Sequence, residues 1–308
     1  MATRLDLLST ELTCAPWRAC GRNAFDLAFE TSHNPRPMTQ ETTTVIEHRL
    51  FQGDYRLLKL SAPAVGPLVQ PGQFVHLRVP RLAAAVLRRP FSVFKADNAG
   101  LSILYKSVGK GTAALATVTE GEEINLIGPL GTGFPNLGKG KTLPVLVAGG
   151  YGNAALYLQA AKLPVKGIAF FGGRSATDIL CVEEFKTLGW DVRVTTDDGS
   201  LGQKGFVTAA LDGWLEEQGA GDRNQVAGSR SQGMELFACG PNAMLKAVGD
   251  RALKNGLTAW LSMDRNMACG VGACLTCVIK RKTADGWEWA RCCKDGPVFE
   301  AREILWEG

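Results

Sequence analysis

The sequence predicts a multidomain fold of α/β plus β type, in which an antiparallel β-barrel, a parallel doubly wound domain and a small C-terminal domain follow one another. Three observations lead to this prediction. Short β-type runs separated by turn residues fill positions 41–138, buried strands alternate with helices over 139–258, and five of the nine cysteines lie within 259–308. At 308 residues the chain is also longer than one hydrophobic core usually serves.

Composition and charge narrow the classes of function. Hydrophobic residues make up 45% of the chain and charged residues 21%, as in ordinary soluble globular proteins. The net charge of +4 is small and the basic residues are scattered, so we expect no nucleic-acid partner. No apolar run approaches the roughly 18 residues that a membrane span needs, so we expect no membrane association. The N-terminus lacks an apolar core with a cleavage site, and a cytoplasmic location is therefore expected.

Residues 1–40 are predicted to form a disordered N-terminal extension, because they end in a polar stretch rich in Pro and Thr. From residue 43 the pattern changes to short runs such as QFVHLRVP and EEINLIGPL, which are separated by turn signals such as Pro71-Gly72. Many short strands at regular spacing are typical of a small antiparallel barrel, which we place at 41–138.

The segment 139–258 changes rhythm again. The apolar run LPVLVAGG ends in glycines and passes into the helix-compatible segment NAALYLQAAK, and further strand candidates are VKGIAFFGG, DVRVTTDDG and MELFACGP. Buried strands that alternate with helices predict a parallel, doubly wound sheet. The polar, glycine-bearing stretch 220–233 is predicted to be a loop insertion.

Cys269, Cys274 and Cys277 have the spacing C-x₄-C-x₂-C, which is typical of plant-type [2Fe–2S] proteins. A loop that wraps a cluster must point its amides at the sulfurs, and Gly270 and Gly272 permit the backbone angles that this needs. Thiolates are soft donors that suit iron. The spacing therefore predicts an iron–sulfur cluster in the C-terminal domain, 259–308.

The fourth ligand must be Cys292 or Cys293, which follow a predicted hairpin with Asp285-Gly286 at its turn. Spacing alone leaves both cysteines open. The alternatives to a cluster are buried or free thiols, or a zinc knuckle. Zinc sites usually contain paired C-x₂-C elements, so the spacing favours the iron–sulfur interpretation.

Two segments of the barrel have the chemistry of a phosphate-bearing ligand site. In the segment 89–92, RPFS, an Arg beside a Ser at a strand start can hold a phosphate and hydrogen-bond a ring edge. In 109–112, GKGT, glycines precede a possible helix whose free amides attract anions. Either motif alone is also compatible with an ordinary strand entry or tight turn.

The glycine-rich turn at 149–152 follows a buried strand and precedes a helix, as a dinucleotide phosphate turn does. It is not a complete G-x-G-x-x-G motif. The segments 197–198 and 239–241 lie at strand ends on the same predicted sheet edge. Turn chemistry, a helix cap and a buried thiol are the simpler alternatives for these segments.

Taken in order, these motifs resemble the ferredoxin reductase superfamily over roughly residues 43–302. They are most similar to the electron-transfer (iron–sulfur flavoprotein) subunit of NAD-dependent dihydroorotate dehydrogenase type B. The resemblance implies an FAD site formed by Arg89, Pro90, Phe91, Ser92, Leu104, Tyr105, Lys106, Gly111 and Thr112. It implies an NAD site formed by Gly149, Gly150, Gly152, Asp197, Asp198, Cys239, Gly240 and Pro241.

For the [2Fe–2S] cluster the resemblance implies the ligands Cys269, Cys274, Cys277 and Cys293, because the family's last ligand directly precedes a K-D-G-P-V-F-like run. The chain departs from the family at the nucleotide turn, where Asn153 and Ala155 replace a small residue and a proline. This departure leaves the choice between NAD and NADP open.

The resemblance also implies a partner, an FMN-containing catalytic subunit that oxidises dihydroorotate to orotate in pyrimidine biosynthesis. Electrons would pass from that FMN through the cluster and FAD to NAD⁺, in a heterotetramer of two copies of each subunit. A flavin suits the middle position because it exchanges both hydride and single electrons. The three histidines of this chain form no obvious acid–base group, so we expect substrate chemistry to lie in the partner.

Two other functions compete with this one. The same domains would serve an NAD(P)H-dependent reductase subunit of another redox complex, and only the partner would distinguish the two. The altered turn at 149–155 also motivates a non-catalytic, cluster-bearing module that has lost nicotinamide binding. Failure of any nicotinamide to reduce the flavin would favour this last function.

Overall fold

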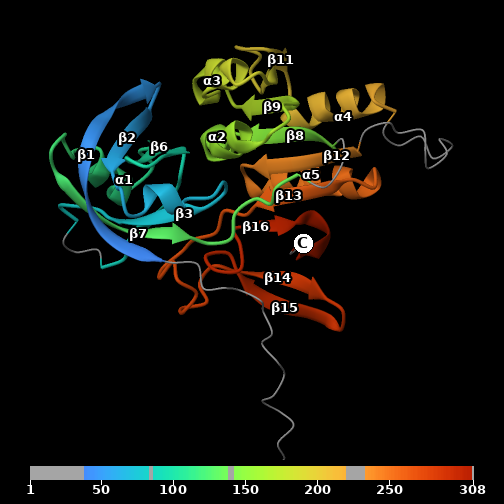
Figure 1. The fold of residues 1–308 in the computed structure, drawn as a ribbon. Helices are drawn as coiled ribbons and strands as arrows, with labels where there is room; N and C mark the ends of the chain where they lie inside the picture. Colours follow the sequence, from blue (N-terminus) through green and yellow to red (C-terminus); the bar gives the residue numbers. More distant parts are fainter. Residues whose placement is uncertain (1–37, 83–85, 138–141, 220–232, 307–308) are drawn as a thin grey trace, which may run out of the picture. The chain divides into compact units, whose positions relative to one another are not determined.

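The structure is a computed structural model that describes residues 38–82, 86–137, 142–219 and 233–306 (Figure 1). The predicted N-terminal extension lies almost entirely outside the described residues, as does the predicted loop insertion except for its last residue. The first strand, β1 (Thr39–Gln52), begins within the segment assigned to the extension. Among the described residues, no helix has the length and apolar character needed to cross a membrane.

The first sheet is antiparallel and has seven strands in the order β4-β3-β7-β1-β2-β6-β5. The edge strands β4 and β5 are consecutive in the chain, and only Val93 and Phe94 separate them. Val93 donates a backbone hydrogen bond to Gln73, and Phe94 donates one to Ser102. One segment thus joins both edges of the sheet and closes the predicted barrel. Its other strands are β2 (Tyr55–Ser61), β3 (Phe74–Arg78), β4 (Arg89–Ser92), β5 (Lys95–Ala96), β6 (Gly100–Lys106) and β7 (Glu123–Leu130).

The barrel core explains why these segments form strands. Ile124 and Leu126 of β7 are fully buried, whereas Asn125 between them is partly exposed, as expected for alternating faces of a strand. Leu115 at the end of the short helix α1 (Lys110–Leu115) is also fully buried in this core. Each such side chain stabilises the fold by roughly 1.5–3 kcal/mol. A 3-10 turn, η1 (Gly66–Leu68), follows β2.

The second sheet has the order β11-β10-β9-β8-β12-β13-β16, and all its pairs are parallel except β13 with β16. Phe170 on one face of β9 contacts Trp214, and Phe171 on the other contacts Phe185. Helices therefore cover both faces, as predicted for a doubly wound sheet. The strands are β8 (Thr142–Gly149), β9 (Ile168–Gly173), β10 (Asp191–Thr196), β11 (Gln203–Lys204), β12 (Gly233–Cys239), β13 (Thr258–Ser262) and β16 (Val298–Glu300). The helices are α2 (Gly152–Lys162), α3 (Val182–Thr187), α4 (Val207–Glu217) and α5 (Asn242–Lys254), with the 3-10 turns η2 (Ala176–Asp178) and η3 (Ala301–Glu303).

The C-terminal unit contains a three-stranded sheet of β14 (Val278–Thr283), β15 (Gly286–Arg291) and β17 (Ile304–Leu305). β14 and β15 form the predicted hairpin. Thr283 pairs with Gly286, so the central turn residues are Ala284 and Asp285, one position earlier than predicted.

The second sheet continues past the predicted boundary between residues 258 and 259. β13 pairs with β12, and β16 returns from the C-terminal unit to pair with β13. Cys277 and Ile279 share one apolar core with Leu261 of β13 and Phe299 of β16. The unit is too small to bury a core of its own, and it completes one by sharing residues with the larger sheet.

Candidate electron-transfer site

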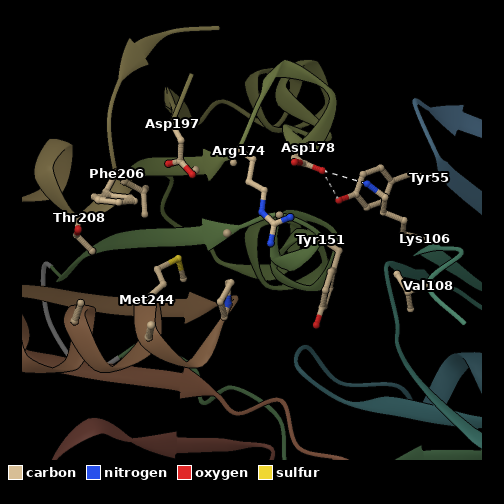
Figure 2. A pocket seen from close by; sticks show the side chains of 18 residues that line it. Tyr55, Lys106, Val108, Tyr151, Arg174, Asp178, Asp197, Phe206, Thr208 and Met244 are labelled. Carbon is tan, nitrogen blue, oxygen red and sulfur yellow. Dashed lines mark hydrogen bonds and ion pairs between the residues drawn. The ribbon is translucent and has the colours of Figure 1, made fainter. Parts of the chain in front are cut away.

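A cavity of about 650 Å³ lies at the carboxyl ends of the second sheet (Figure 2). It is lined by Gly149 at the end of β8 and Gly150 after it, Arg174 after β9, Asp197 after β10 and Pro241 after β12. The carboxyl ends of parallel strands meet at one edge, where such folds bind nucleotides. Four residues predicted from separate segments, Gly149, Gly150, Asp197 and Pro241, are thereby brought together.

Two glycines of the turn lie in close contact with neighbouring segments. A Cβ atom on Gly152 would lie 2.0 Å from the carbonyl oxygen of Cys239, and one on Gly149 would lie 2.8 Å from Sδ of Met244. Gly150 has φ +57°, and nothing lies within 4 Å of its Cβ position. Gly152 therefore lets α2 approach β12 closely, and Gly149 lets α5 lie close to the end of β8, while the backbone at Gly150 stays open for a ligand.

Asp198, Cys239 and Gly240, which are predicted for the nicotinamide site, do not line this cavity. Asp198 accepts hydrogen bonds from the backbone N and Oγ of Ser200, at 2.9 and 2.6 Å, and these bonds lower the pKa of its carboxyl group. Gly240 packs against Gly149 and Met244. Cys239 lines a second cavity instead, and burial raises the pKa of its thiol to about 12.

Sequence analysis missed several residues of the larger cavity. Arg174 projects from the end of β9 into the space between Asp197 and Tyr151 (Figure 2). The sequence could have pointed to Arg174, because this residue directly follows the glycines that end a predicted strand at the same sheet edge. The other missed lining residues come from the barrel, from η2, and from α4 and α5 with the residue before α4, and include Tyr55, Val108, Asp178, Phe206, Thr208 and Met244.

An acid–base cluster joins the barrel to the nucleotide domain at this cavity. Tyr55 donates a hydrogen bond to Asp178 at 3.1 Å, and Nζ of Lys106 lies 3.6 Å from the same carboxylate (Figure 2). Burial and the carboxylate of Asp178 raise the pKa of Tyr55, so the phenol remains protonated. Gln52 adds hydrogen bonds to the carbonyls of Ala176 and Ile179. Two barrel side chains, those of Tyr55 and Lys106, thus contact the carboxylate of Asp178 in the wall of the cavity.

A neighbouring cavity of about 240 Å³ collects most of the predicted flavin residues. Lys106, Val108 and Tyr151 line both cavities, so the two adjoin. Met267 and Pro297, which flank the ligand cysteines in sequence, also line the smaller cavity. The predicted residues in its wall are Pro90, Phe91, Ser92, Leu104, Tyr105, Lys106 and Thr112.

Arg89 and Gly111, the two remaining predicted flavin residues, contact each other outside this lining. A Cβ atom on Gly111 would lie 2.8 Å from Nε of Arg89, so the absence of a side chain at Gly111 leaves space for the Arg89 side chain. The hydroxyl of Thr112 accepts hydrogen bonds from the backbone N of Val108 and Gly109. The motifs 89–92 and 109–112 therefore meet, and Thr112 stabilises the turn at Val108 and Gly109.

Aromatic side chains give the smaller cavity walls that suit a planar ring. Phe91 and Tyr105 meet edge to face at 5.7 Å, and Phe74 lies in the same wall. His48 hydrogen-bonds Oη of Tyr105, and burial raises the pKa of this phenol to about 12. Tyr151, between the two cavities, donates a hydrogen bond to Asp264. The residues present fit an isoalloxazine ring.

The four predicted cluster ligands lie in two pairs. Cys274 lies near Cys269 and 3.2 Å from Oγ1 of Thr276, and hydrogen bonds from Thr276 and Cys269 lower the pKa of its thiol to about 6. The backbone N of Cys293 donates to Sγ of Cys277 at 3.4 Å. Burial and the Cys277 sulfur raise the pKa of Cys293 to about 12. Two pairs of sulfurs suit two metal ions. In the described part of the chain, no group of three or more His, Cys, Asp or Glu side chains surrounds a single ion.

The geometry distinguishes Cys293 from Cys292. Cys293 interacts with Cys277, Cys269 and the backbone of Gly272. Cys292 is completely buried, and burial raises the pKa of its thiol to about 12. Cys292 also lies near Cys277, and its backbone N donates a hydrogen bond to the carbonyl of Cys277 at 2.9 Å. Cys293 in addition interacts with Cys269 and the backbone of Gly272, and this supports the alternative that the resemblance implies.

Comparisons with known proteins agree with this arrangement. A sequence model of the iron–sulfur cluster binding domain of dihydroorotate dehydrogenase B matches residues 264–305. The electron transfer subunit of dihydroorotate dehydrogenase B (NAD⁺) from Geobacillus kaustophilus (strain HTA426) is 36% identical over 273 residues, which is 86% of this chain and 98% of the relative. The subunit of the same name from Fusobacterium nucleatum subsp. nucleatum is 35% identical and covers 87% of this chain and 99% of the relative.

Solved structures share the fold. The structure of an NADH-dependent reduced ferredoxin-NADP oxidoreductase, described for flavin-based electron bifurcation, superposes with a TM-score of 0.71 at 28% identity over 86% of this chain and 90% of that chain. A ferredoxin reductase of carbazole 1,9a-dioxygenase has a TM-score of 0.59 at 21% identity, over 72% of this chain and 67% of that chain.

Fold and site together define an oxidoreductase component with an FAD-binding, ferredoxin-reductase-like fold and an iron–sulfur cluster domain. Its relatives are 34–36% identical over nearly their whole length. The chain belongs to the family of electron transfer subunits of dihydroorotate dehydrogenase B (NAD⁺).

Proposed function

We propose that this chain carries electrons from an FMN-containing catalytic subunit, which oxidises dihydroorotate to orotate, through a [2Fe–2S] cluster and FAD to NAD⁺. The observation that supports the proposal is that the nucleotide cavity, the flavin cavity and the cysteine loop adjoin one another in this order. Lys106, Val108 and Tyr151 form a common wall between the nucleotide cavity and the flavin cavity. The flavin cavity in turn is bordered by Met267, two residues before Cys269.

For FAD, the proposal assigns the ring to the smaller cavity, between Phe91 and Tyr105 of the barrel and Tyr151 of the nucleotide domain. Arg89 beside Gly111 offers a guanidinium group to the phosphates. Flavin, when bound, exchanges both hydride and single electrons. Ala154 and Ala155 of α2 also line the cavity, and their small side chains leave space beside the ring.

For the nicotinamide nucleotide, the proposal assigns the phosphates to the open backbone at Gly150. Asp197 lines the same cavity at the end of β10. A carboxylate at such a strand end accepts hydrogen bonds from ribose hydroxyls and repels a 2′-phosphate. Asp197 therefore supports NAD over NADP.

For the cluster, the proposal assigns Cys269 and Cys274 to one iron and Cys277 and Cys293 to the other. The spacing and the arrangement of the sulfurs in two pairs support the [2Fe–2S] type over larger clusters. Gly270 supports the same assignment, because its φ of +72° is the conformation that a wrapped loop needs.

For the partner, the proposal assigns the face around Cys274 to the contact with the catalytic subunit. Leu275 is 60% exposed and Val271 38% exposed, beside ligands that must exchange electrons with another protein. An apolar rim of this kind loses water when a partner covers it. We propose two copies of each subunit, as the family resemblance implies, and a cytoplasmic location, where a reducing environment keeps cysteine thiolates available as cluster ligands.

The test is an anaerobic titration of the purified protein with NADH and then NADPH, followed by visible absorption. We expect NADH to bleach both the flavin and the cluster bands, and NADPH to act far more weakly. Co-purification with an FMN-containing dihydroorotate dehydrogenase, with a measured mass equal to two of each subunit, tests the partner. Bands that neither nucleotide changes would contradict the proposed relay.

One observation favours a second function, that of an NAD(P)H-dependent reductase subunit of another redox complex. The structural match to an NADH-dependent reduced ferredoxin-NADP oxidoreductase is 28% identical over 86% of this chain. The two functions differ in the electron donor. Reduction of the cluster by dihydroorotate in the presence of the FMN subunit would support the first function, and reduction only by a ferredoxin would support the second.

A further inference from the structure

His76 lies at the boundary between the flavin cavity and the cysteine loop. It is on β3, opposite Pro90 of β4, and its side chain is 1% exposed. Its ring centroid lies 5.6 Å from that of Phe74, and both Phe74 and Pro90 line the flavin cavity. On the other side, a Cβ atom on Gly270 would come within 2.5 Å of Cε1 of His76. The imidazole therefore occupies the space directly over the residue that follows Cys269.

Both nitrogens of this imidazole lack a partner in the described part of the chain. Nδ1 and Nε2 of His76 are buried and form no hydrogen bond. His48 shows the usual situation, because its nitrogens bond to the carbonyl of Val118 and the hydroxyl of Tyr105. An imidazole carries at least one N–H donor in either protonation state, and buried donors without an acceptor are rare in native proteins. The acceptor for His76 therefore belongs to a group that the described polypeptide does not supply.

We propose that His76 is a positioning residue that donates a hydrogen bond to a sulfur of the cluster held by Cys269, and so raises the reduction potential of that cluster. This inference rests on the proposed function, because it requires a cluster in the cysteine loop. Sulfurs are the acceptors that this loop brings to the residue after Cys269. A hydrogen bond to them stabilises the extra negative charge of the reduced cluster, and this makes reduction more favourable.

The position of His76 indicates which redox group the proposed hydrogen bond would affect. The imidazole touches the wall of the flavin cavity on one side and the cysteine loop on the other. A donor at this place changes the potential of the cluster relative to the flavin without occupying either site. The remaining effect is steric, because the ring also fixes the path of the loop at Gly270.

The first test is a potentiometric titration of the full-length protein, loaded with flavin and cluster, monitored by electron paramagnetic resonance. His76→Phe fills the same space without a donor, and we expect its cluster potential to shift downward. His76→Gln keeps a side-chain donor, and we expect a smaller shift. The flavin potential stays unchanged in both variants. An unchanged cluster potential in His76→Phe, or a shift confined to the flavin, would overturn the inference.

The second test detects the hydrogen bond directly in the wild-type protein, and variants serve only to assign it. The chain has three histidines, which can be labelled with ¹⁵N. We expect pulsed electron paramagnetic resonance of the reduced wild-type cluster to show a coupling to histidine nitrogen. His76→Gln loses this coupling, and His48→Phe keeps it. A wild-type cluster without any histidine coupling would refute the role of His76 alone, whereas a wild-type protein that binds no cluster would refute the proposed function.

Discussion

Adjacent cysteines with different surroundings give the sharpest prediction at the scale of single residues. Both side chains are buried, but Cys293 also interacts with Cys269 and the backbone of Gly272 in the cysteine loop. We expect Cys293→Ser to lose the cluster absorption bands while NADH still reduces the flavin. Cys292→Ala, the matched control, keeps one cluster per chain. Iron and sulfide analysis with visible spectra checks both variants, and equal cluster contents would contradict the assignment.

Gly152 allows a second prediction, because its Cβ position lies 2.0 Å from a backbone carbonyl oxygen. Gly152→Ala must push α2 away from Cys239, and we expect lower stability and weaker NADH binding. Gly213, inside α4, has nothing within 4 Å of its Cβ position, so Gly213→Ala should stabilise the protein by roughly 0.5–1 kcal/mol. Urea unfolding and NADH titration measure both effects. Equal effects of the two substitutions on stability and on NADH binding would contradict the close contact at Gly152.

The site residues that the sequence predicts are those that belong to short local motifs. The cysteine spacing predicts three ligands within nine positions, since local geometry alone constrains them. Tyr151 and Asp264 are 113 positions apart, and Tyr55 and Asp178 are 123 apart. Their contacts depend on how separate loops meet, which no local pattern encodes. Asp197 and Asp198 show the same limit, because only the structure tells which carboxylate lines the cavity.

At the scale of elements, local patterns predict most strands and helices but not how the strands pair. Alternating and buried apolar runs mark the barrel strands and β8, β9, β10 and β12, because burial and period are local properties. The predicted C-terminal domain begins at residue 259, one residue into β13. The membership of β13 in the second sheet depends on pairing with β12 and β16, which is a property of the assembled sheet.

The turn before β7 allows a prediction about pH. Glu122 accepts hydrogen bonds from the backbone and hydroxyl of Thr119 and from Arg81, which lower its pKa to about 2 from an ordinary value of 4.5. The ionised form is thus favoured by folding, and this contribution is complete above about pH 4.5 and is lost as the pH falls toward 2.

We therefore expect Glu122→Gln to lower the urea midpoint at pH 7, and the difference from wild type to narrow as the pH falls from about 4.5 toward 2. Glu120→Gln, two positions earlier, serves as the control and should change the midpoint little. A difference that stayed constant down to the lowest pH measured would show that these hydrogen bonds do not depend on the charge.

At the scale of the whole molecule, the C-terminal unit and the nucleotide domain behave as one packed body. Cys277 and Cys293 belong to the same apolar cluster as Leu261 and Phe299. Loss of the iron–sulfur cluster should therefore disturb β13 and β16 as well as the cysteine loop. This shared core also explains how the ligands keep a fixed position relative to the flavin cavity, which single-electron transfer requires.

The barrel and the nucleotide domain are joined at the larger cavity by Asp178, and this contact carries the last prediction. Lys106 lies 3.6 Å from Asp178 and 3.7 Å from Asp54, but only Asp178 also accepts the hydrogen bond of Tyr55. We expect Asp178→Ala to slow flavin reduction by NADH by about tenfold or more, because the two cavities lose their alignment. Asp54→Ala removes an exposed ion pair and should change the rate little. Anaerobic stopped-flow absorption measures both rates, with the cluster spectrum as a check on folding. Equal rates in the two variants would show that Asp178 does not align the domains.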